Sequence, residues 1–455
     1  MELEVISKEN IKPSSPTPPH LKTFNLSILD QLITTPYIPI ILYYPNHNGE
    51  NVLQALKKSM LLKKSLSKTL TQFYPLAGTT KDHLSIDCND VGASYVLALV
   101  HGRCDDFLRQ PDHLFMNRFL PIEPSFDGSN VGAPVTNVQV NIFKCGGIAI
   151  GVCISHNILD GAAFYTFLKG WANMACGSEV IYPNLTASSI FPAKSLWLRD
   201  ISMVFFQSLL KHGKCSTKRF VFDSNAIAAL KDEATKNGVQ KATKVEVVSA
   251  LIWKCAVAAS KVACGFDNTS TLTHAVNLRR KLATESSTDF IGNMIWISTA
   301  VCQASNELTL HGLVNKVRES IAKVDIEFVN KAQGVDGHVA MQKSLKENGK
   351  NGSIGGVENY NFTSWCNMGF YDIDFGWGKP SWVTGIAGNG APVFMNLVTL
   401  MDTKCYGGIE AWVNLGEEEM KSLQCNNELL AYASLDPSAL PNDEVDIVQN
   451  ISQPI

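Results

Sequence analysis

One histidine and one aspartate stand four residues apart where an apolar run gives way to a helix-like run. The stretch is GVCISHNILDGAAFYTF, residues 151–167, in which His156 is followed by Asp160 and Gly161. A neutral imidazole can take a proton from a hydroxyl group near pH 7, so His156 is a candidate general base. Side chains at such a strand-to-helix junction in an open α/β sheet face a ligand crevice, and Gly161 permits a tight turn there.

The histidine–aspartate spacing alone does not single out this stretch, because it recurs at HLSID (83–87) and HGRCD (101–105). The first lies in an alternating, strand-like segment and predicts a surface pair, whereas the second lies in a polar, loop-like segment. Only His156 ends an apolar run. Two structural explanations stay open here: Asp160 caps the following helix, and His156 is a buried imidazole with a satisfied hydrogen bond.

A second candidate is DFGWG, residues 374–378. Its first three letters occur in protein kinases, but the kinase glycine-rich loop and H-R-D sequence are missing. No G-x-S-x-G or Walker sequence occurs, and no two of the 12 cysteines form a C-x-x-C pair. The sequence therefore excludes a kinase, a G-x-S-x-G hydrolase, a P-loop enzyme and a C-x-x-C zinc or redox site.

The composition is that of a folded protein. The 455 residues are 45% hydrophobic and 18% charged, with a formal net charge of −3. These values exclude a mainly disordered chain and predict no basic surface for nucleic acid. The first 20 residues lack a signal-peptide pattern, and the apolar stretches are too short to cross a bilayer. We expect a cytoplasmic protein with reduced cysteines and with no membrane or nucleic-acid partner.

Residues 51–73 have the period of an amphipathic helix, with Leu53, Leu56, Met60 and Leu61 at helical spacing. Its other faces carry Lys57, Lys58, Lys63, Lys64 and Lys68. Such a basic face fits either a membrane surface or solvent, and we expect solvent because the sequence shows no second membrane anchor.

The rest of the chain mixes helix and strand signals. Residues 134–155 predict a hairpin whose nearly all-apolar second arm is a central strand buried on both faces. Two long helices and two late strands are predicted at 244–263, 311–332, 391–403 and 406–416. Residues 184–220 are irregular and predict a crossover between two halves.

Together the two motifs resemble the plant BAHD acyltransferases, which transfer acyl groups from coenzyme A thioesters. That family pairs H-x-x-x-D-G with a later D-F-G-W-G, here at 156–161 and 374–378. Further similar stretches lie at 66–78, 86–98, 276–282 and 290–298. Within the family the chain is most similar to the branch of vinorine synthase and the alkaloid O-acetyltransferases.

The resemblance implies an α/β fold of two similar mixed-sheet domains, chloramphenicol acetyltransferase-like, around a through-going solvent channel. We expect the N-terminal domain at residues 1–200 plus about 374–398, and a crossover at 201–219. The C-terminal domain is expected at 220–373 plus about 399–440, followed by a loose tail at 441–455.

The resemblance also implies the activity. We expect transfer of acetyl from acetyl-CoA, a co-substrate, to a hydroxyl of a bulky specialised metabolite such as a monoterpene indole alkaloid. His156 is the general base, no acyl-enzyme forms, no cofactor or metal is permanently bound, and the protein is a monomer. The alternatives are a volatile alcohol, terpenoid or amine acceptor, or a non-catalytic metabolite-binding homologue. Relatives that acylate carboxylated acceptors carry an arginine where this chain has Asn367, which argues against an acidic acceptor.

The remaining site residues follow by position in the family motifs. Asp160 pairs with Arg279 and supports the His156 loop together with Gly161. Asp374 either holds the turn formed by Gly376, Trp377 and Gly378 or acts as a second catalytic carboxylate.

Three further assignments concern the reacting groups. The indole N–H of Trp377 or a backbone amide is expected to stabilise the oxyanion. Ser249 and Trp377 are the expected coenzyme A contacts, although helix packing explains Ser249 equally well. Cys153 is the rival nucleophile, and its place on a buried strand favours core packing.

Overall fold

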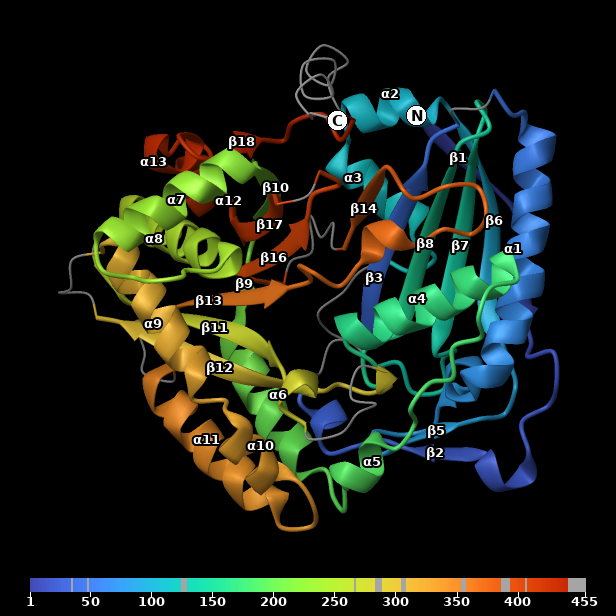
Figure 1. Ribbon diagram of the computed structural model, residues 1–455, viewed down its shortest axis with the longest axis horizontal. Coiled ribbons are helices and arrows are strands. Elements are labelled where there is room, and N and C mark those ends of the chain that lie inside the picture. Colours follow the sequence, from blue (N-terminus) through green and yellow to red (C-terminus); the bar gives the residue numbers. More distant parts are fainter. Residues whose placement is uncertain are drawn as a thin grey trace, which may run out of the picture.

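The structure is a computed structural model that describes residues 1–33, 36–46, 49–123, 129–265, 267–282, 289–303, 308–352, 357–385, 393–405 and 407–440. The chain forms two lobes side by side, each built on a sheet with helices against it (Figure 1). The first lobe contains mainly the blue-to-green part of the chain and the second mainly the green-to-red part.

The first lobe is built on a six-stranded mixed sheet. Its strands in spatial order are β1 (Glu2–Ile11), β6 (Ala93–His101), β7 (Thr136–Phe143), β8 (Ile148–Ser155), β3 (Tyr37–Tyr44) and β14 (Trp382–Thr384). Only β6 and β7 run parallel. All eight residues of β8 are buried, which confirms the predicted central strand. Helices α1 (Val52–Gln72) and α4 (Gly161–Cys176) pack together on one face (Figure 1).

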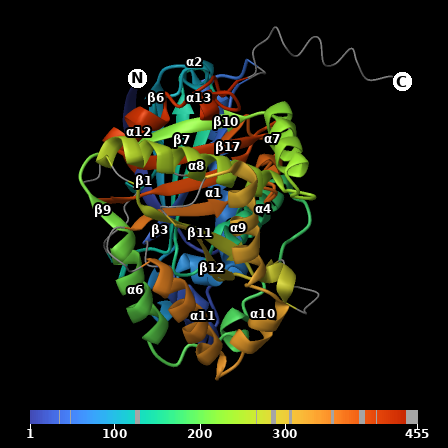
Figure 2. The same cartoon turned by 90° about the vertical axis from the view of Figure 1, so that its left-hand side faces the viewer.

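The second lobe is built on a seven-stranded mixed sheet. Its strands in order are β12 (Ile295–Cys302), β11 (Thr269–Asn277), β13 (Val357–Ser364), β16 (Leu397–Asp402), β17 (Ile409–Gly416), β10 (Cys215–Phe222) and β18 (Ser434–Leu435). β13 runs parallel to both of its neighbours. Figure 2 shows α7 (Ser224–Lys236), α8 (Lys244–Cys264) and α9 (Leu310–Ala322) in front of this sheet. The predicted helix at 244–263 and the late strands are confirmed.

Smaller elements complete the described chain. A three-stranded sheet contains β2 (Thr23–Asn25), β5 (Ser85–Asp87) and β4 (Thr79–Thr80), and β9 (Leu210–His212) pairs with β15 (Val393–Met395). The other α-helices are α2 (Cys104–Arg109), α3 (His113–Met116), α5 (Ala187–Ile190), α6 (Trp197–Leu209), α10 (Ile326–Ala332), α11 (Gly337–Gly352), α12 (Glu417–Leu423) and α13 (Asn427–Leu430). Short 3₁₀ helices span Pro19–Leu21, Leu29–Gln31, Tyr74–Ala77, Asn117–Phe119, Arg279–Lys281 and Phe370–Asp372.

The buried face of α1 is not the predicted one. The side chains of Leu53 and Met60 are 68% and 69% exposed, and Leu61 is exposed as well. The helix instead buries Ala55, Ser59, Leu62, Ser65, Leu66, Thr69 and Leu70. The prediction was wrong because two of these serines make buried hydrogen bonds, Ser59 with the Tyr95 hydroxyl and Ser65 with the donating indole N–H of Trp171. A contact face that carries hydroxyl groups gives no hydrophobic signal.

Three other predictions need correction. Residues 311–332 form two helices, because Asp325 caps α10 through the N–H of Phe328 and so ends the continuous helix. The stretch predicted as irregular contains α6, which buries only Leu198, Ser202 and Leu209 and therefore has a sparse apolar period. His101 ends β6 instead of lying in a loop.

One late segment crosses between the lobes. β14 pairs with β3 in the first sheet, with Trp382 opposite Tyr43. β15 pairs with β9, however, and β16 begins at Leu397 in the second sheet. The first lobe's share of this stretch is therefore shorter than the predicted 374–398. The other domain limits stay a prediction, and the predicted tail at 441–455 lies outside the described residues.

α8 is the one helix in the described chain that is long and apolar enough to cross a membrane. The mean hydropathy of its apolar window is 1.6, but 61% of that window is buried inside the molecule. Thr243 and Glu246 form a capping box at its start, and Gly265 ends it with a left-handed φ of 84°. Its burial makes α8 the central helix of the second lobe's core.

Candidate active site

The loop that carries His156 joins the end of β8 to the start of α4, and both lobes hold its backbone. The His156 N–H donates to the carbonyl oxygen of Pro36 at 3.0 Å, and the His156 carbonyl accepts from the Asn293 side chain at 2.7 Å. The Asn130 amide supports the same loop by donating to Ser155 Oγ at 2.7 Å and to the Pro36 carbonyl at 3.0 Å. The position of the imidazole is therefore fixed through its main chain.

The carboxylate of Asp160 caps α4 and binds Arg279, and neither interaction includes a hydrogen bond to the imidazole of His156. One carboxylate oxygen accepts from the Ala163 N–H at 3.0 Å, which is the N-cap expected as one explanation. The other accepts from Arg279 Nη1 at 2.7 Å and from the Met294 N–H at 2.9 Å. Both charged side chains are almost fully buried. The structure thus brings Asp160 and Arg279 together as the resemblance implies, across the boundary between the lobes.

The sequence reasoning missed a second buried carboxylate, that of Asp30. One of its oxygens accepts from the main-chain N–H and the side chain of Asn293, at 2.7 and 3.0 Å. The other accepts from the N–H and hydroxyl of Ser27 at 2.7 and 2.8 Å. Burial raises the pKa of Asp30. Asp30 therefore orients the same Asn293 amide that holds the His156 carbonyl, and an isolated Asn or Asp in a sequence gives no signal of such a contact.

Burial keeps the imidazole of His156 neutral. It lowers the pKa of His156 below the ordinary value of 6.5. Main-chain hydrogen bonding at His156, the Asp160 carboxylate, and weaker hydrogen bonding to Leu159 and Asn293 act in the opposite direction. The Nδ1 atom is buried and has no hydrogen-bond partner among the described residues. The side chain as a whole keeps partial exposure. A neutral, incompletely hydrogen-bonded imidazole can accept a proton from a bound hydroxyl group.

Cys153 is not a competing nucleophile. Its thiol is buried in β8 and points toward the Ile122 carbonyl at 3.8 Å. Burial raises the pKa of Cys153 to about 12, so the reactive thiolate is negligible near neutral pH. The buried-strand interpretation made from the sequence agrees with this geometry.

The DFGWG motif forms a tight turn around one carboxylate oxygen. Asp374 Oδ1 accepts from the N–H groups of Gly376, Trp377 and Gly378 at 2.7, 3.1 and 2.9 Å. Gly376 and Gly378 have φ values of 104° and 105°, where a side chain would be strained. These contacts correspond to the turn-holding interpretation of Asp374.

Two contacts of the DFGWG turn place it far from His156. The Trp377 ring lies 6.2 Å from the ring of Tyr44, which pairs with Ile148 at the start of β8, whereas His156 follows its last residue. Seven residues of strand span about 23 Å. The Asp374 carbonyl accepts from the Cys176 thiol at the far end of α4, and that 16-residue helix is about 24 Å long.

Two predicted roles are incompatible with this separation. The Trp377 indole cannot reach an oxyanion beside His156, while its expected contact with coenzyme A stays a prediction. Asp374 cannot exchange a proton there. The backbone amide, the other expected oxyanion donor, stays a prediction.

The predicted coenzyme A contact at Ser249 is buried. Ser249 has no exposed surface, and its hydroxyl has no hydrogen-bond partner among the described residues. It lies in the core face of α8. This position favours the packing explanation.

A pocket of about 660 Å³ lies between the end of β16 and residues 365–380 and carries three lysines. Lys244, Lys379 and Lys404 line it together with Trp365. Trp365 also covers the start of α4, because a Cβ atom added at Gly161 would lie 3.2 Å from Trp365 Nε1. Glycine at position 161 thus allows Trp365 to contact the start of α4 and also to line the pocket.

Comparison with known proteins extends over nearly the whole chain. The family model described as the transferase family matches residues 1–430. An epi-neemfruitin B 7-O-acetyltransferase of Melia azedarach is 41% identical over 97% of this chain and 100% of its own length. A limonoid 7-O-acetyltransferase of Citrus sinensis is 42% identical with the same coverage. A stemmadenine O-acetyltransferase of Catharanthus roseus is 35% identical over 93% of this chain and 96% of its own.

Solved structures agree in fold. The crystal structure of vinorine synthase is 33% identical, covers 96% of this chain and 100% of its own, and superposes with a TM-score of 0.80. A TRI101 structure of F. sporotrichioides, solved with coenzyme A and T-2, is 18% identical, covers 91% of this chain and 99% of its own, and has a TM-score of 0.72. The two mixed sheets are therefore those of a chloramphenicol acetyltransferase-like fold, and the chain belongs to the transferase family of plant BAHD acyltransferases as an acyl-CoA-dependent O-acyltransferase.

Proposed function

We propose that this chain transfers the acetyl group of acetyl-CoA to a hydroxyl of a bulky, uncharged polycyclic metabolite, with His156 as general base. The observation that carries this proposal is a neutral, partly exposed imidazole whose backbone is fixed by Pro36 and Asn293. An imidazole so placed can act on two substrates that meet between the lobes. The solvent channel through which they would enter is part of the proposal.

The reaction needs one proton acceptor and no covalent enzyme intermediate. His156 takes the hydroxyl proton while the alcohol oxygen attacks the thioester carbonyl carbon, which becomes a tetrahedral oxyanion. Collapse of this intermediate breaks the carbon–sulfur bond, and His156 returns the proton to the coenzyme A thiolate. The buried, protonated thiol of Cys153 favours this direct route over an acyl-enzyme.

The names of the relatives favour a terpenoid-like acceptor over the alkaloid expected from the sequence. The two relatives at 41% and 42% identity are named for limonoid-type acceptors, whereas the akuammiline synthases and the stemmadenine enzyme are 35–37% identical. We therefore rank a limonoid hydroxyl first and an indole alkaloid hydroxyl second. Asn367 supplies no positive charge for an acidic acceptor.

We further propose that the three-lysine pocket binds the phosphates of acetyl-CoA. Lys244 pairs with Asp402 at 2.5 Å, and Lys379 pairs with Asp372 at 2.7 Å. Lys404 donates to the Ser381 hydroxyl at 3.3 Å and pairs with no carboxylate among the described residues. Lys404→Glu should raise the KM for acetyl-CoA about tenfold without changing kcat. The KM for S-acetylpantetheine, which lacks the adenosine phosphates, should not change. Lys323→Glu in a pocket of the other face is the matched control.

The decisive experiment measures acetylated product by mass spectrometry, because several exposed cysteines would disturb a thiol-release assay. The purified chain is incubated with acetyl-CoA and a panel of limonoid, indole alkaloid and volatile alcohols. We expect product from a polycyclic alcohol, and its loss in His156→Ala. Product formation that survives this substitution would overturn the general-base role. No product with any acceptor would favour the non-catalytic homologue.

A further inference from the structure

The outer face of α1 combines large apolar side chains with lysines. Six exposed residues form this surface, called here the α1 stripe: Leu53, Lys57, Met60, Leu61, Lys64 and Lys68. At 100° per residue they fall within about 100° of arc, opposite the buried face of the helix. Figure 1 shows α1 at the outer edge of the first lobe, with no element outside it.

The charges of the α1 stripe are all positive. The sequence of α1 contains no aspartate or glutamate. The two lysines at the flanks of the helix are paired, Lys58 with Glu50 and Lys63 with Glu9 at 2.5 Å. The three stripe lysines form no ion pair within the described part of the chain. Lys12 lies beside the last turns of α1, where its carbonyl accepts from Ser67 Oγ. The surface is therefore locally basic on a chain with net charge −3.

The apolar side chains lie among these lysines and not on a separate face. Leu53 and Met60 each expose more than two thirds of their surface. A helix face that only meets solvent carries charges of both signs and few large apolar groups. Apolar side chains flanked by lysines are the composition of a helix that lies in a membrane interface, where long lysine side chains reach the headgroups while leucine and methionine enter the acyl boundary.

We propose that the α1 stripe docks this acyltransferase onto the surface of anionic phospholipid membranes. α1 has 21 residues and is about 32 Å long, so it can lie flat along the interface. The stripe is a convex ridge, which a bilayer can accept without shape complementarity. Attraction is reversible and electrostatic, because three apolar side chains alone bind a membrane weakly. This contact does not depend on the identity of the acyl acceptor.

The test is co-sedimentation of the full chain with phosphatidylserine-rich vesicles and with pure phosphatidylcholine vesicles. We expect binding to the anionic vesicles, weakened by salt, and little binding to the neutral ones. The triple variant Lys57→Glu, Lys64→Glu and Lys68→Glu should bind at least about tenfold more weakly. Leu53→Ser with Met60→Ser should also weaken binding.

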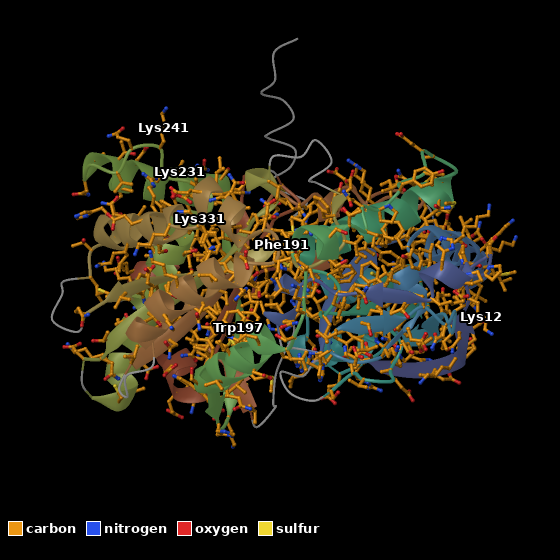
Figure 3. The ribbon with its side chains drawn as sticks, turned by 90° about the horizontal axis from the view of Figure 1, so that it is seen from below. Lys12, Phe191, Trp197, Lys231, Lys241 and Lys331 are labelled. Atoms are coloured by element: carbon orange, nitrogen blue, oxygen red, sulfur yellow. The ribbon has the colours of Figure 1, made fainter. Side chains whose placement is uncertain are left out.

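The control carries the same charge change at the other end of the molecule. The triple variant is Lys231→Glu, Lys236→Glu and Lys241→Glu, in α7 and the loop that follows it. Figure 3 shows Lys231 and Lys241 in the second lobe, far from Lys12. It should bind vesicles like the unaltered chain, and both triple variants should keep soluble acetyl transfer. Equal loss in both triples would overturn the proposal, because the contact would then reflect net charge alone. The proposal would also be overturned if the unaltered chain does not bind the anionic vesicles. This holds even if the chain binds an acidic protein.

Discussion

The loops at the two ends of α4 are both organised by an aspartate, yet they differ in what the aspartate holds. At the N-terminal end, Asp160 is buried, ion-paired with Arg279 across the lobes and four residues from His156. At the C-terminal end, Asp374 is partly exposed and gathers three backbone N–H groups of its own turn. A motif that stands out in a sequence can therefore mark backbone geometry as readily as chemistry.

The comparison is tested most severely by His156→Ala. Removal of a general base should lower kcat/KM by about 10²–10⁴-fold, while the midpoint of thermal unfolding stays close to that of the unaltered chain. The measurement pairs steady-state kinetics with thermal denaturation. If the thermal midpoint falls so far that unfolding explains the loss of kcat/KM, then His156 supports the fold, and the two ends of α4 do not differ in the way described.

Asp160→Ala should have the largest effect on stability. It leaves the Arg279 guanidinium buried without its carboxylate and removes the cap of α4, at a cost of about 3–5 kcal/mol. Urea unfolding measures this change. Combining it with Arg279→Leu should restore part of the loss, because no unpaired charge is then buried. If the double variant is less stable than Asp160→Ala, the ion pair is not the cause.

Asn293→Ala should separate positioning from chemistry. The substitution removes the hydrogen bond to the His156 carbonyl and leaves Asp30 with fewer donors, so we expect about 1–3 kcal/mol of destabilisation. The kcat should fall about tenfold with the KM for acetyl-CoA unchanged, because only the imidazole moves. A change confined to KM would place Asn293 in substrate binding instead.

Asp374→Asn should have a small effect. The amide oxygen can still accept from Gly376, Trp377 and Gly378, so kcat should stay within about threefold of its original value. Asp374→Ala should cost about 1–2 kcal/mol of stability, with the folded enzyme still active. A hundredfold loss of kcat in the asparagine variant, with stability unchanged, would restore a catalytic role for this carboxylate.

The pH dependence should be the mildest effect. Burial lowers the pKa of His156 below 6.5, so the base stays neutral at pH 7. The kcat/KM should therefore decline only when the pH falls below 6.5. The unfolded chain binds this proton more readily than the folded one, so stability should also decline as the pH falls through the same window. In His156→Gln the stability change contributed by this group should vanish. A profile that declines only above pH 7 would contradict the assignment.

The sequence predicts the central features and misses those that depend on side-chain contacts between distant segments. The apolar run before His156 predicts β8, and the family motif predicts the Asp160–Arg279 pair. Asp30 and Asn293 could not be found, because their role exists only when segments 263 positions apart meet. The α1 face was misassigned because its buried serines hydrogen-bond the Tyr95 hydroxyl and the Trp171 indole N–H, and such polar contacts give no hydrophobic period. The oxyanion role given to Trp377 failed because membership of a family motif says nothing about distance from the base.

The placement of β14 bears on how the protein is made. Tyr43 in β3 and Trp382 in β14 are neighbours in one sheet but lie 339 positions apart in the chain. During translation at about 5–20 residues per second, the growing chain would carry an uncovered β3 edge for roughly 20–70 s. We therefore expect poor yield of any fragment that stops before β14, because its β3 edge stays unpaired.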